Sequence, residues 1–237
     1  GDSSEVEDEL SNGVTDIFSN RSAFAALKDD GSVVTWGDNR LSGGDSSRVE
    51  EELSNGVTDI FSALFAFAAL KDDGSVVTWG SNGGNSSAVE DELSNGVTDI
   101  FSNRSAFAAL KEDGSVVTWG NNSYGGDSSE VEDELSNGVT NIFSTHRAFA
   151  ALKDDGSVVT WGNDARGGDS SEVEDDLTEG VTDIFSTDTD FAALKEDGSV
   201  VTWGNWAGDS SEVADELDSG VVTLASPFVK TGDAFIP

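Results

Sequence analysis

The sequence contains no cysteine, no methionine and a single histidine. Without cysteine, disulfide bonds and thiol chemistry are excluded, and the redox compartment stays undetermined. Without methionine, we expect the chain to be a processed product or an excised segment. The one histidine, His146, has no second histidine or cysteine with which to build a zinc site, and no catalytic triad repeats. We therefore expect no metal site and no catalytic residues, and we predict that the chain is not an enzyme.

Basic side chains are also scarce. Only 12 residues are Lys or Arg, against 47 Asp and Glu, which gives 237 residues a net charge of −35. Nucleic acids and anionic membrane surfaces require a basic footprint, so we exclude nucleic acid as a partner. The sequence has no signal peptide and no apolar run of membrane-spanning length, so we expect no membrane insertion.

What the chain has in abundance is one repeated segment. Phe-Ala-Ala-Leu-Lys-Asp-Asp-Gly-Ser-Val-Val-Thr-Trp-Gly occupies residues 24–37, and nearly unchanged copies occupy residues 67–80, 107–120, 149–162 and 191–204. Two β-prone runs flank an Asp-Gly pair, which predicts a β-hairpin around a primed turn. Five hairpins of one design indicate a repeat protein.

Each hairpin follows an acidic segment and one further strand. In residues 1–13, Ser4-Glu5-Val6-Glu7 fits a capping box and Asn12-Gly13 fits a helix stop, so the sequence predicts a short helix. Residues 14–19 predict the first strand. Successive Trp-Gly pairs lie 43, 40, 42 and 42 residues apart. A repeat of about 42 residues therefore contains a short helix and three antiparallel strands.

These repeats divide a single repeat domain, residues 1–237, into five full units and a degenerate sixth. The units span residues 1–43, 44–83, 84–125, 126–167 and 168–207, and residues 208–237 form a degenerate cap. Phe-Ala-Ala-Leu has no polar face, so neighbouring sheets should cover both of its faces. We predict a mainly β fold, a β-propeller-like array of these repeats, with an open solenoid as the alternative.

The repeat also resembles that of a known family. The pattern Gly-Val-x-x-Ile-x-Ser, three loop residues and then Phe-Ala-Ala-Leu-Lys-x-Asp-Gly-Ser-Val-Val-Thr-Trp-Gly is similar to the repeat of the regulator of chromosome condensation superfamily, in a bacterial-type form with shortened acidic repeats. In all but the fifth unit an Ala precedes the Phe, and the resemblance covers all five units. It implies a β-propeller in which each repeat supplies the strands of a blade. The founder's nucleotide exchange on a small GTPase is not implied, because this surface is acidic and the units are too alike to contain a specialised exchange site.

The units differ mainly in two short windows. The first window joins the first two strands, at residues 20–22, 63–65, 103–105, 145–147 and 187–189. The second window follows the Trp-Gly pair, at residues 38–43, 81–82, 121–124, 163–166 and 205–206. Rigid scaffolds often present variable loops as binding surfaces, although loops also vary because they are little constrained. The candidate ligand-binding residues in these windows are Arg21, Phe65, Arg104, Tyr124, His146, Arg147 and Trp206.

The acidic hairpin turns, such as Asp29-Asp30-Gly31, offer at most weak Ca²⁺ binding. They lack the alternating oxygen ligands and the distal Glu of a calcium-binding loop. The preference of hairpin turns for Asp and Gly explains the composition of these segments without a bound ion. We expect no cofactor.

Two kinds of function are compatible with these features. The first is a non-enzymatic structural or adhesive protein, extracellular or on the cell surface, as the near-identical acidic units indicate. The alternative is a ligand-binding propeller of carbohydrate type, in which Phe65, Tyr124 and Trp206 serve as stacking faces. The expected partners are a second copy of the chain, or an extracellular glycan or protein.

The end of the chain indicates self-association. Residues 209–226 repeat the acidic segment and the first strand, but no complete hairpin follows. The strand at residues 221–225 is too apolar to remain a bare edge. It either closes the ring as a shortened blade or docks head to tail on the first unit of another molecule. The residues of that contact would be Val221, Val222, Leu224 and Phe228.

Overall fold

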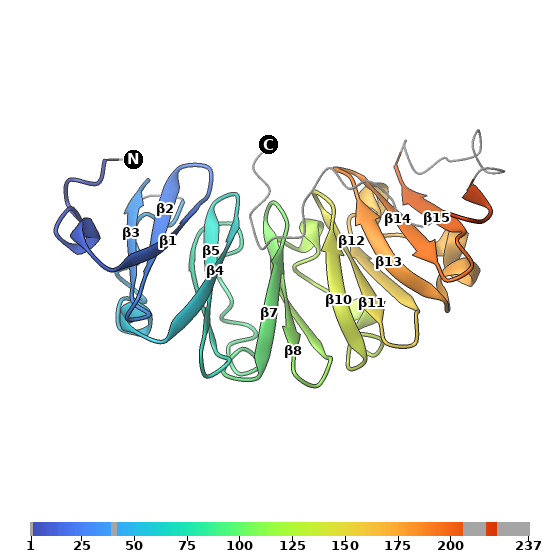
Figure 1. The fold of residues 1–237 in the computed structure, drawn as a ribbon, viewed down its shortest axis with the longest axis horizontal. Helices are drawn as coiled ribbons and strands as arrows, with labels where there is room; N and C mark the ends of the chain where they lie inside the picture. Colours follow the sequence, from blue (N-terminus) through green and yellow to red (C-terminus); the bar gives the residue numbers. More distant parts are fainter. Residues whose placement is uncertain (1, 39–41, 206–216, 222–237) are drawn as a thin grey trace.

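The computed structural model describes residues 2–38, 42–205 and 217–221. Within them, fifteen strands form five separate antiparallel sheets of three strands, each ordered as in the sequence. Figure 1 shows the sheets following one another in a curved row, with the first and the last at opposite ends. The predicted array of three-stranded β units is confirmed, and its described part forms an open row.

The strands have nearly the same length and register in every repeat. In the first sheet Phe24 lies opposite Trp36 and Leu27 opposite Val33, and the first strand has a bulge after Val14. The strands are β1 (Val14–Ser19), β2 (Ala23–Lys28), β3 (Val33–Gly37), β4 (Val57–Ala63), β5 (Ala66–Lys71), β6 (Val76–Gly80), β7 (Val97–Ser102), β8 (Ala106–Lys111), β9 (Val116–Gly120), β10 (Val139–Ser144), β11 (Ala148–Lys153), β12 (Val158–Gly162), β13 (Val181–Ser186), β14 (Asp190–Lys195) and β15 (Val200–Gly204).

The Asp-Gly pair forms the predicted hairpin, but the turn is not the predicted primed type. Lys28 N donates to Ser32 O at 2.9 Å, so the three residues between them form the loop. Gly31 has a φ of 76°, and a Cβ at this position would lie 2.7 Å from the backbone N of Gly56 in the next repeat. Asp30 accepts hydrogen bonds from the backbone N and the hydroxyl of Ser32. These contacts favour a three-residue loop with a left-handed glycine.

The helix predicted in the acidic segments of the five full repeats is wrong in type and length. The first segment contains only a 3₁₀ turn, without a side-chain cap. Asp2 Oδ1 instead accepts from the backbone N of Ser4 at 3.0 Å. Segments this short do not offset the cost of helix nucleation, and their closely spaced carboxylates repel one another. No helix among the described residues is long and apolar enough to span a membrane. The 3₁₀ helices are η1 (Glu9–Ser11), η2 (Glu52–Ser54), η3 (Asn122–Tyr124), η4 (Ser129–Val131), η5 (Asp164–Arg166) and η6 (Ser171–Leu177).

Each inner sheet is covered on both faces by its neighbours. In β5, Ala68 and Leu70 pack into the cluster shared with the third sheet. The intervening Phe67 and Ala69 pack into the cluster shared with the first sheet. The alanines and Phe67 are fully buried, which confirms that this strand has no solvent-exposed face. Small alanine side chains allow the sheets to approach closely.

Every repeat contains a stacked Phe–Trp pair, and in the second to fifth repeats the pair lies at the junction with the preceding repeat. The ring centroids are 5.2–5.3 Å apart in all five repeats. The linker of the preceding repeat covers the pair, and Trp79 Nε1 donates to Gly43 O at 3.0 Å. Among the described residues, Trp119 is an exception, because its Nε1 is buried without a hydrogen-bond partner. The linker before it, residues 81–83, is shorter than the other linkers.

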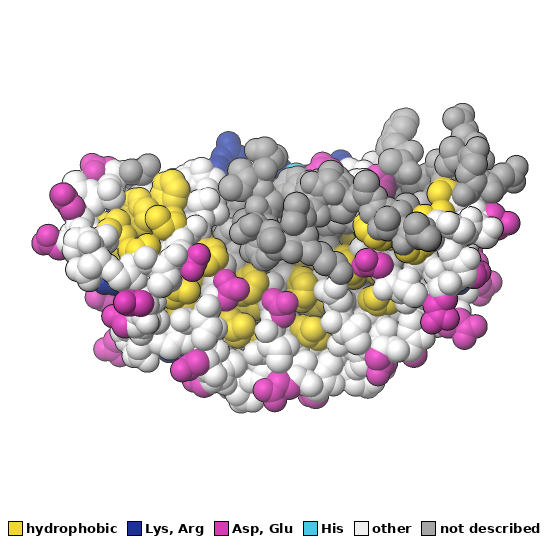
Figure 2. All heavy atoms as spheres, in the orientation of Figure 1, with side chains coloured by type: hydrophobic (Ala, Val, Ile, Leu, Met, Phe, Trp, Pro, Cys, Tyr) yellow, Lys and Arg dark blue, Asp and Glu magenta, His cyan; other side chains and the backbone are white. Residues whose placement is uncertain are grey.

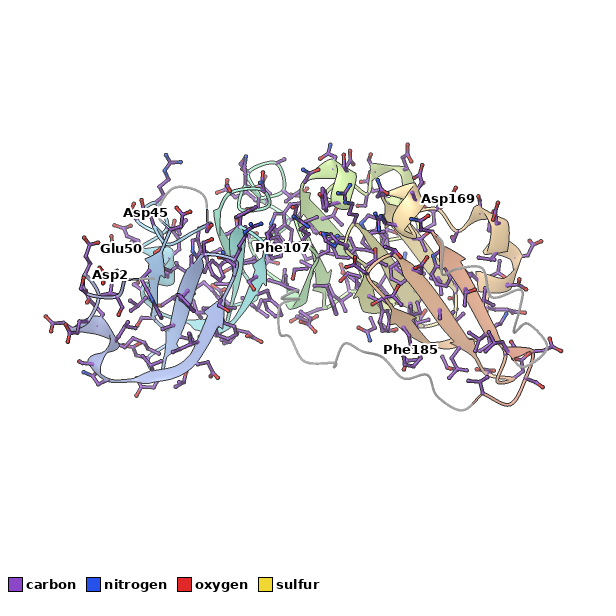
Figure 3. All side chains as sticks on the ribbon, turned by 90° about the horizontal axis from the view of Figure 1, so that it is seen from above. Asp2, Asp45, Glu50, Phe107, Asp169 and Phe185 are labelled. Carbon is purple, nitrogen blue, oxygen red and sulfur yellow. The ribbon has the colours of Figure 1, made fainter. Side chains whose placement is uncertain are left out.

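The first strands contact one another along the row. Ser62 Oγ donates to Ser19 O at 3.0 Å, Ser102 Oγ to Ser62 O at 2.9 Å, and Ser144 Oγ to Ser102 O at 3.0 Å. Seen from above in Figure 3, Phe185 of β13 lies on one long side of the row, whereas Asp45 and Asp169 of the acidic segments lie on the other. The serine ladder therefore joins the sheets on the side opposite the acidic segments.

The leading face of the first sheet is the surface that later repeats bury against the preceding sheet. Ile17 on this face is 61% exposed. Its four counterparts, Ile60, Ile100, Ile142 and Ile184, are only 0–3% exposed. Figure 2 shows hydrophobic side chains at the surface at this end of the row. Within the described structure, the first repeat thus presents an apolar face that has no sheet against it.

The junction tryptophans should differ in their contribution to stability according to what covers them. Trp161 is 4% exposed and donates to Gly125 O, so we expect Trp161→Ala to lower the free energy of unfolding by about 3–5 kcal/mol. Trp36 is only half-buried, because no repeat precedes it in the described structure. Trp36→Ala should therefore cost clearly less. Equal losses in denaturant titrations of the two variants would show that stacking between repeats is not what stabilises these rings.

Candidate functional site

The two variable windows of a repeat meet at one end of its sheet. Asn20 Nδ2 of the first window donates to Ser42 O of the second at 2.5 Å. The same contact joins Asn103 Nδ2 to Tyr124 O at 2.6 Å and Thr145 Oγ1 to Arg166 O at 2.8 Å. The windows that differ most between repeats therefore form one surface, which we call the loop face.

The first residue of each first window closes its loop. Asn103 Oδ1 accepts from Ser105 N at 3.1 Å and from Ala106 N at 3.0 Å. Thr145 Oγ1 accepts in the same way from the backbone N of the residues two and three positions later. Ala63 has no side-chain acceptor, and β4 there extends through it to a tighter turn. These residues hold the loops in place, so the second and third positions are the ones available for contact.

The second positions of the first windows form a row across the repeats. Arg21 N donates to Leu64 O at 3.3 Å, Leu64 N to Arg104 O at 2.9 Å, and His146 N to Asp188 O at 3.0 Å. We call Arg21, Leu64, Arg104, His146 and Asp188 the loop row. Backbone bonds at three of the four junctions, and the side-chain contact of Arg104 with His146 at the fourth, make the row a continuous surface.

Three side chains of the loop row form a hydrogen-bonded chain. Arg104 Nη1 lies 2.8 Å from His146 Nε2, and His146 Nδ1 lies 3.1 Å from Asp188 Oδ1. A guanidinium can only donate, so Nε2 must accept and the imidazole is neutral in this arrangement. The proton then lies on Nδ1 and points at the carboxylate. His146 thus joins Arg104 to Asp188 across three repeats.

The aromatic candidates are already partly covered by arginine. The guanidinium carbon of Arg21 lies 5.8 Å from the ring centroid of Phe65, and that of Arg147 lies 4.8 Å from the ring centroid of Tyr124. Both distances are in the range of cation–π contacts. One face of each ring is therefore occupied. Trp206, the third predicted stacking residue, lies outside the described residues.

Of the predicted self-association residues, only Val221 is described. Its backbone N donates to Gly198 O at 3.0 Å, the bond that Val57 N makes to Gly31 O in an earlier repeat. Val221 thus begins a further repeat on the fifth sheet. Val222, Leu224 and Phe228 lie outside the described residues, and their role stays a prediction.

The acidic hairpin turns use their carboxylates locally. Asp113 Oδ1 accepts from the hydroxyl and the backbone N of Ser115, and these bonds lower the pKa of Asp113. The same bonds lower the pKa of Asp30, Asp73, Asp155 and Asp197. Among the described residues, no three His, Asp or Glu side chains are grouped closely enough to hold a metal ion. At most weak Ca²⁺ binding by these turns stays a prediction.

The site prediction left out the first residues of the first windows, Asn20, Asn103, Thr145 and Thr187. The sequence did indicate this role, since Asn and Thr side chains commonly accept hydrogen bonds from the backbone N two or three residues later. It also left out Asp190, which occupies the position of an alanine in the other four repeats. Asp190 is 4% exposed and accepts from the hydroxyls of Thr187 and Thr189. It thus belongs to the closure of its own loop.

Comparisons with known proteins support the resemblance seen in the sequence. Residues 97–125 match the family model described as the regulator of chromosome condensation (RCC1) repeat. The matched segment contains β7, β8 and β9, which have counterparts in every other repeat. No curated protein matches the chain.

Several solved structures are similar to this one. The CRINKLY WD40 ectodomain of the Arabidopsis thaliana receptor kinase ACR4 matches with 15% identity and a TM-score of 0.50, over 82% of this chain and 66% of that one. Prp20p from Saccharomyces cerevisiae matches with 19% identity and a TM-score of 0.48, over 84% and 58%. Human WBSCR16 matches with 19% identity and a TM-score of 0.49, over 81% and 61%. The chain thus spans less than two thirds of each of these structures, and identities this low show the fold alone.

Loop closure by the first window residue can be tested at Asn103. This side chain is 5% exposed and satisfies two backbone donors and one backbone acceptor. Asn103→Ala leaves these groups without a partner, so we expect a loss of about 1–3 kcal/mol in the free energy of unfolding. Asn122→Ala, at an exposed position of the adjacent second window, is the control and should change stability by less than about 0.5 kcal/mol. Equal effects in denaturant titrations would contradict the assigned role.

Proposed function

We propose that this chain, in which residues 97–125 match the regulator of chromosome condensation repeat, is a non-enzymatic structural or adhesive protein that binds a partner through its loop face. The observation that carries this proposal is the meeting of the two variable windows, through contacts such as Asn103 Nδ2 to Tyr124 O. The units differ where these windows lie and are nearly identical elsewhere.

The packing of the repeats supports a scaffold of this kind. The five Phe–Trp pairs have almost the same geometry, and backbone hydrogen bonds join the loops of successive repeats. Loops on a rigid framework lose little conformational entropy when they bind. We place this function outside the cell or on its surface, where salt screens the self-repulsion of a chain with a net charge of −35.

A protein partner is better supported than a carbohydrate. Sugar binding by stacking requires open aromatic faces, and guanidinium groups cover one face of Phe65 and of Tyr124. Both residues are also half-buried. A carbohydrate ligand of the loop face remains the alternative proposal.

The proposal is tested by removing the variation while keeping the fold. The first windows of the first and third units both read Asn-Arg-Ser. We would replace both of them by Thr-Asp-Thr, the first window of the fifth unit, whose Thr187 also closes its loop, and measure binding to a panel of immobilised extracellular matrix proteins and to a glycan array. We expect the parent chain to bind a protein of the panel, and the loop variant to bind it at least about tenfold more weakly, or 1.4 kcal/mol.

A matched control makes a second pair of repeats uniform at the opposite end of the sheets. Glu112→Asp and Glu196→Asp convert two hairpin turns to the Asp-Asp-Gly of the other three. This control variant should bind like the parent. Unchanged binding by the loop variant, or a parent that binds nothing on either panel, would contradict the proposal.

Self-assembly is a second candidate function, favoured by the uncovered leading face of the first repeat. Ile17 is exposed there, whereas its counterparts are buried against the preceding sheet. A second copy of the chain is the occupant that we propose, since its last repeat would continue the contact already made four times within the chain. Such a head-to-tail contact extends into a filament unless its rotation closes a ring.

Ile17→Asp tests this second candidate without disturbing the monomer, because the side chain is already in water. We expect the mass measured by light scattering to rise with concentration for the parent chain and to stay at that of a monomer for the variant. Leu64→Asp, on the loop row, is the control and should associate like the parent. A parent chain that stays monomeric at every concentration would show that the leading face does not dock a second copy.

A further inference from the structure

Charge is distributed very unevenly between the loop face and the rest of the chain. The ten windows contain five of the 12 basic residues and three of the 47 acidic ones, so their net charge is +2. The remaining residues have a net charge of −37. A basic surface on a molecule this acidic is unexpected if the loops vary freely.

The window arginines lie at one end of the sheets, and most carboxylates lie toward the other end. Each first strand runs from an acidic segment to a first window, and Asp29 N donates to Gly13 O where the acidic segment meets the Asp-Gly turn. Figure 2 shows basic side chains and the histidine at the upper edge, beside a few carboxylates, and most carboxylates along the other edges and on the front. Arginines and carboxylates are therefore separated along the strand direction.

Lysine and arginine have different roles in this arrangement. Lysine side chains donate to backbone carbonyls of the acidic segments at 2.6–2.8 Å, and so hold those segments in place; the pairs are Lys71 with Glu52, Lys111 with Glu92, Lys153 with Glu134, and Lys195 with Asp176. All four bonds lie at the acidic end. No lysine lies in a window, whereas five of the six arginines do.

The described arginines of the first windows contact neutral groups. Arg21 lies over the Phe65 ring, Arg147 over the Tyr124 ring, and Arg104 donates to the neutral Nε2 of His146. In these contacts the rings and the imidazole orient the guanidinium groups without neutralising their charge. Arg21 and Arg104 are exposed, and Arg147 is half-buried. Within the described residues, none of these three guanidinium groups has a direct ion pair with a carboxylate, so three oriented positive charges lie on one surface.

We propose that the loop face binds a carboxylate-rich peptide segment of a partner protein, with Arg21, Arg104 and Arg147 as its anchors. This inference rests on the proposed function and specifies the chemistry of the partner. The planar fork of a guanidinium matches a carboxylate with two parallel hydrogen bonds. Asp188 orients Arg104 through His146, and so acts as a positioning residue.

Other anionic partners fit this surface less well. A nucleic acid carries phosphates along its whole length, and those beyond the loop face would meet the acidic remainder of the chain. Single strands also require aromatic faces for base stacking, and Phe65 and Tyr124 each have a guanidinium over one face. A short acidic peptide is small enough to contact the loop face alone, and its carboxylates require only the guanidinium groups of the arginines as partners.

The test measures fluorescence anisotropy of labelled hexaglutamate, with labelled hexaglutamine as the neutral probe, at low and at physiological salt. The variant Arg21→Gln/Arg104→Gln removes two exposed anchors, and we expect it to bind hexaglutamate at least about tenfold more weakly than the parent. Arg48 is the one arginine outside the windows and is also exposed. The matched control therefore pairs Arg48→Gln with Lys28→Gln, which removes the same charge outside the loop face, and it should bind like the parent.

The variant Arg104→Lys separates the contribution of bidentate hydrogen bonding from the contribution of positive charge to binding. It should bind more weakly than the parent and more tightly than Arg104→Gln, because lysine keeps the charge but not the bidentate geometry. Absence of hexaglutamate binding at low salt would overturn the inference. Equal losses in the anchor and control variants would also overturn it, as would tighter binding of a sulfated oligosaccharide than of hexaglutamate.

Failure of this inference can be told from failure of the proposed function. If hexaglutamate does not bind but replacement of residues 20–22 and 103–105 by Thr-Asp-Thr still abolishes binding to a matrix protein, the loop face is a binding surface with another chemistry. If that replacement leaves matrix-protein binding unchanged, the proposed function itself is wrong. Circular dichroism and thermal melts of every variant confirm that the fold is kept.

Discussion

Contact between successive repeats is the interaction on which the rest of the structure depends. The Phe67–Trp79 pair is completed by the preceding repeat, whose Gly43 carbonyl accepts from the indole. A Cβ at Gly43 would lie 3.1 Å from both rings, so the linker can pass over them only as glycine. A three-stranded sheet cannot bury both of its apolar faces alone, and each repeat is therefore stable only against a neighbour.

This dependence explains where the units are alike and where they differ. Alanines of the second strand are fully buried between sheets in the three inner repeats, and a larger side chain there would separate the repeats. The loops lie at the end of the sheets, where a substitution disturbs no junction. The junctions also tolerate variation in linker length. The short linker at residues 81–83 leaves Trp119 Nε1 without a hydrogen-bond partner among the described residues, but the Phe107–Trp119 stack is kept.

The charges follow the same division between the two ends of the sheets. Lysine ammonium groups at the turn end bond the carbonyls of the acidic segments, and thereby help to hold a chain of high negative charge in its compact form. The arginines at the loop end have aromatic rings and an imidazole as neighbours. Lysines thus hold the acidic segments, and the arginines, to which we assign recognition as a proposal, lie at the opposite end of the same strands.

The sequence by itself determined the repeat, the strands and the burial of Phe-Ala-Ala-Leu on both faces, because these depend on patterns within a few residues. It also located the variable windows and most candidate residues. It was wrong about the acidic segment, whose capping pattern is helical but whose length is too short for a helix, and about the type of turn at Gly31, which closely approaches Gly56 of the next repeat. Only the tertiary structure decided that Asn103 meets Tyr124, 21 residues away, and that Arg104 meets His146, 42 residues away. These contacts depend on how one repeat is rotated against the next, and that geometry is set by packing between sheets rather than by any local pattern.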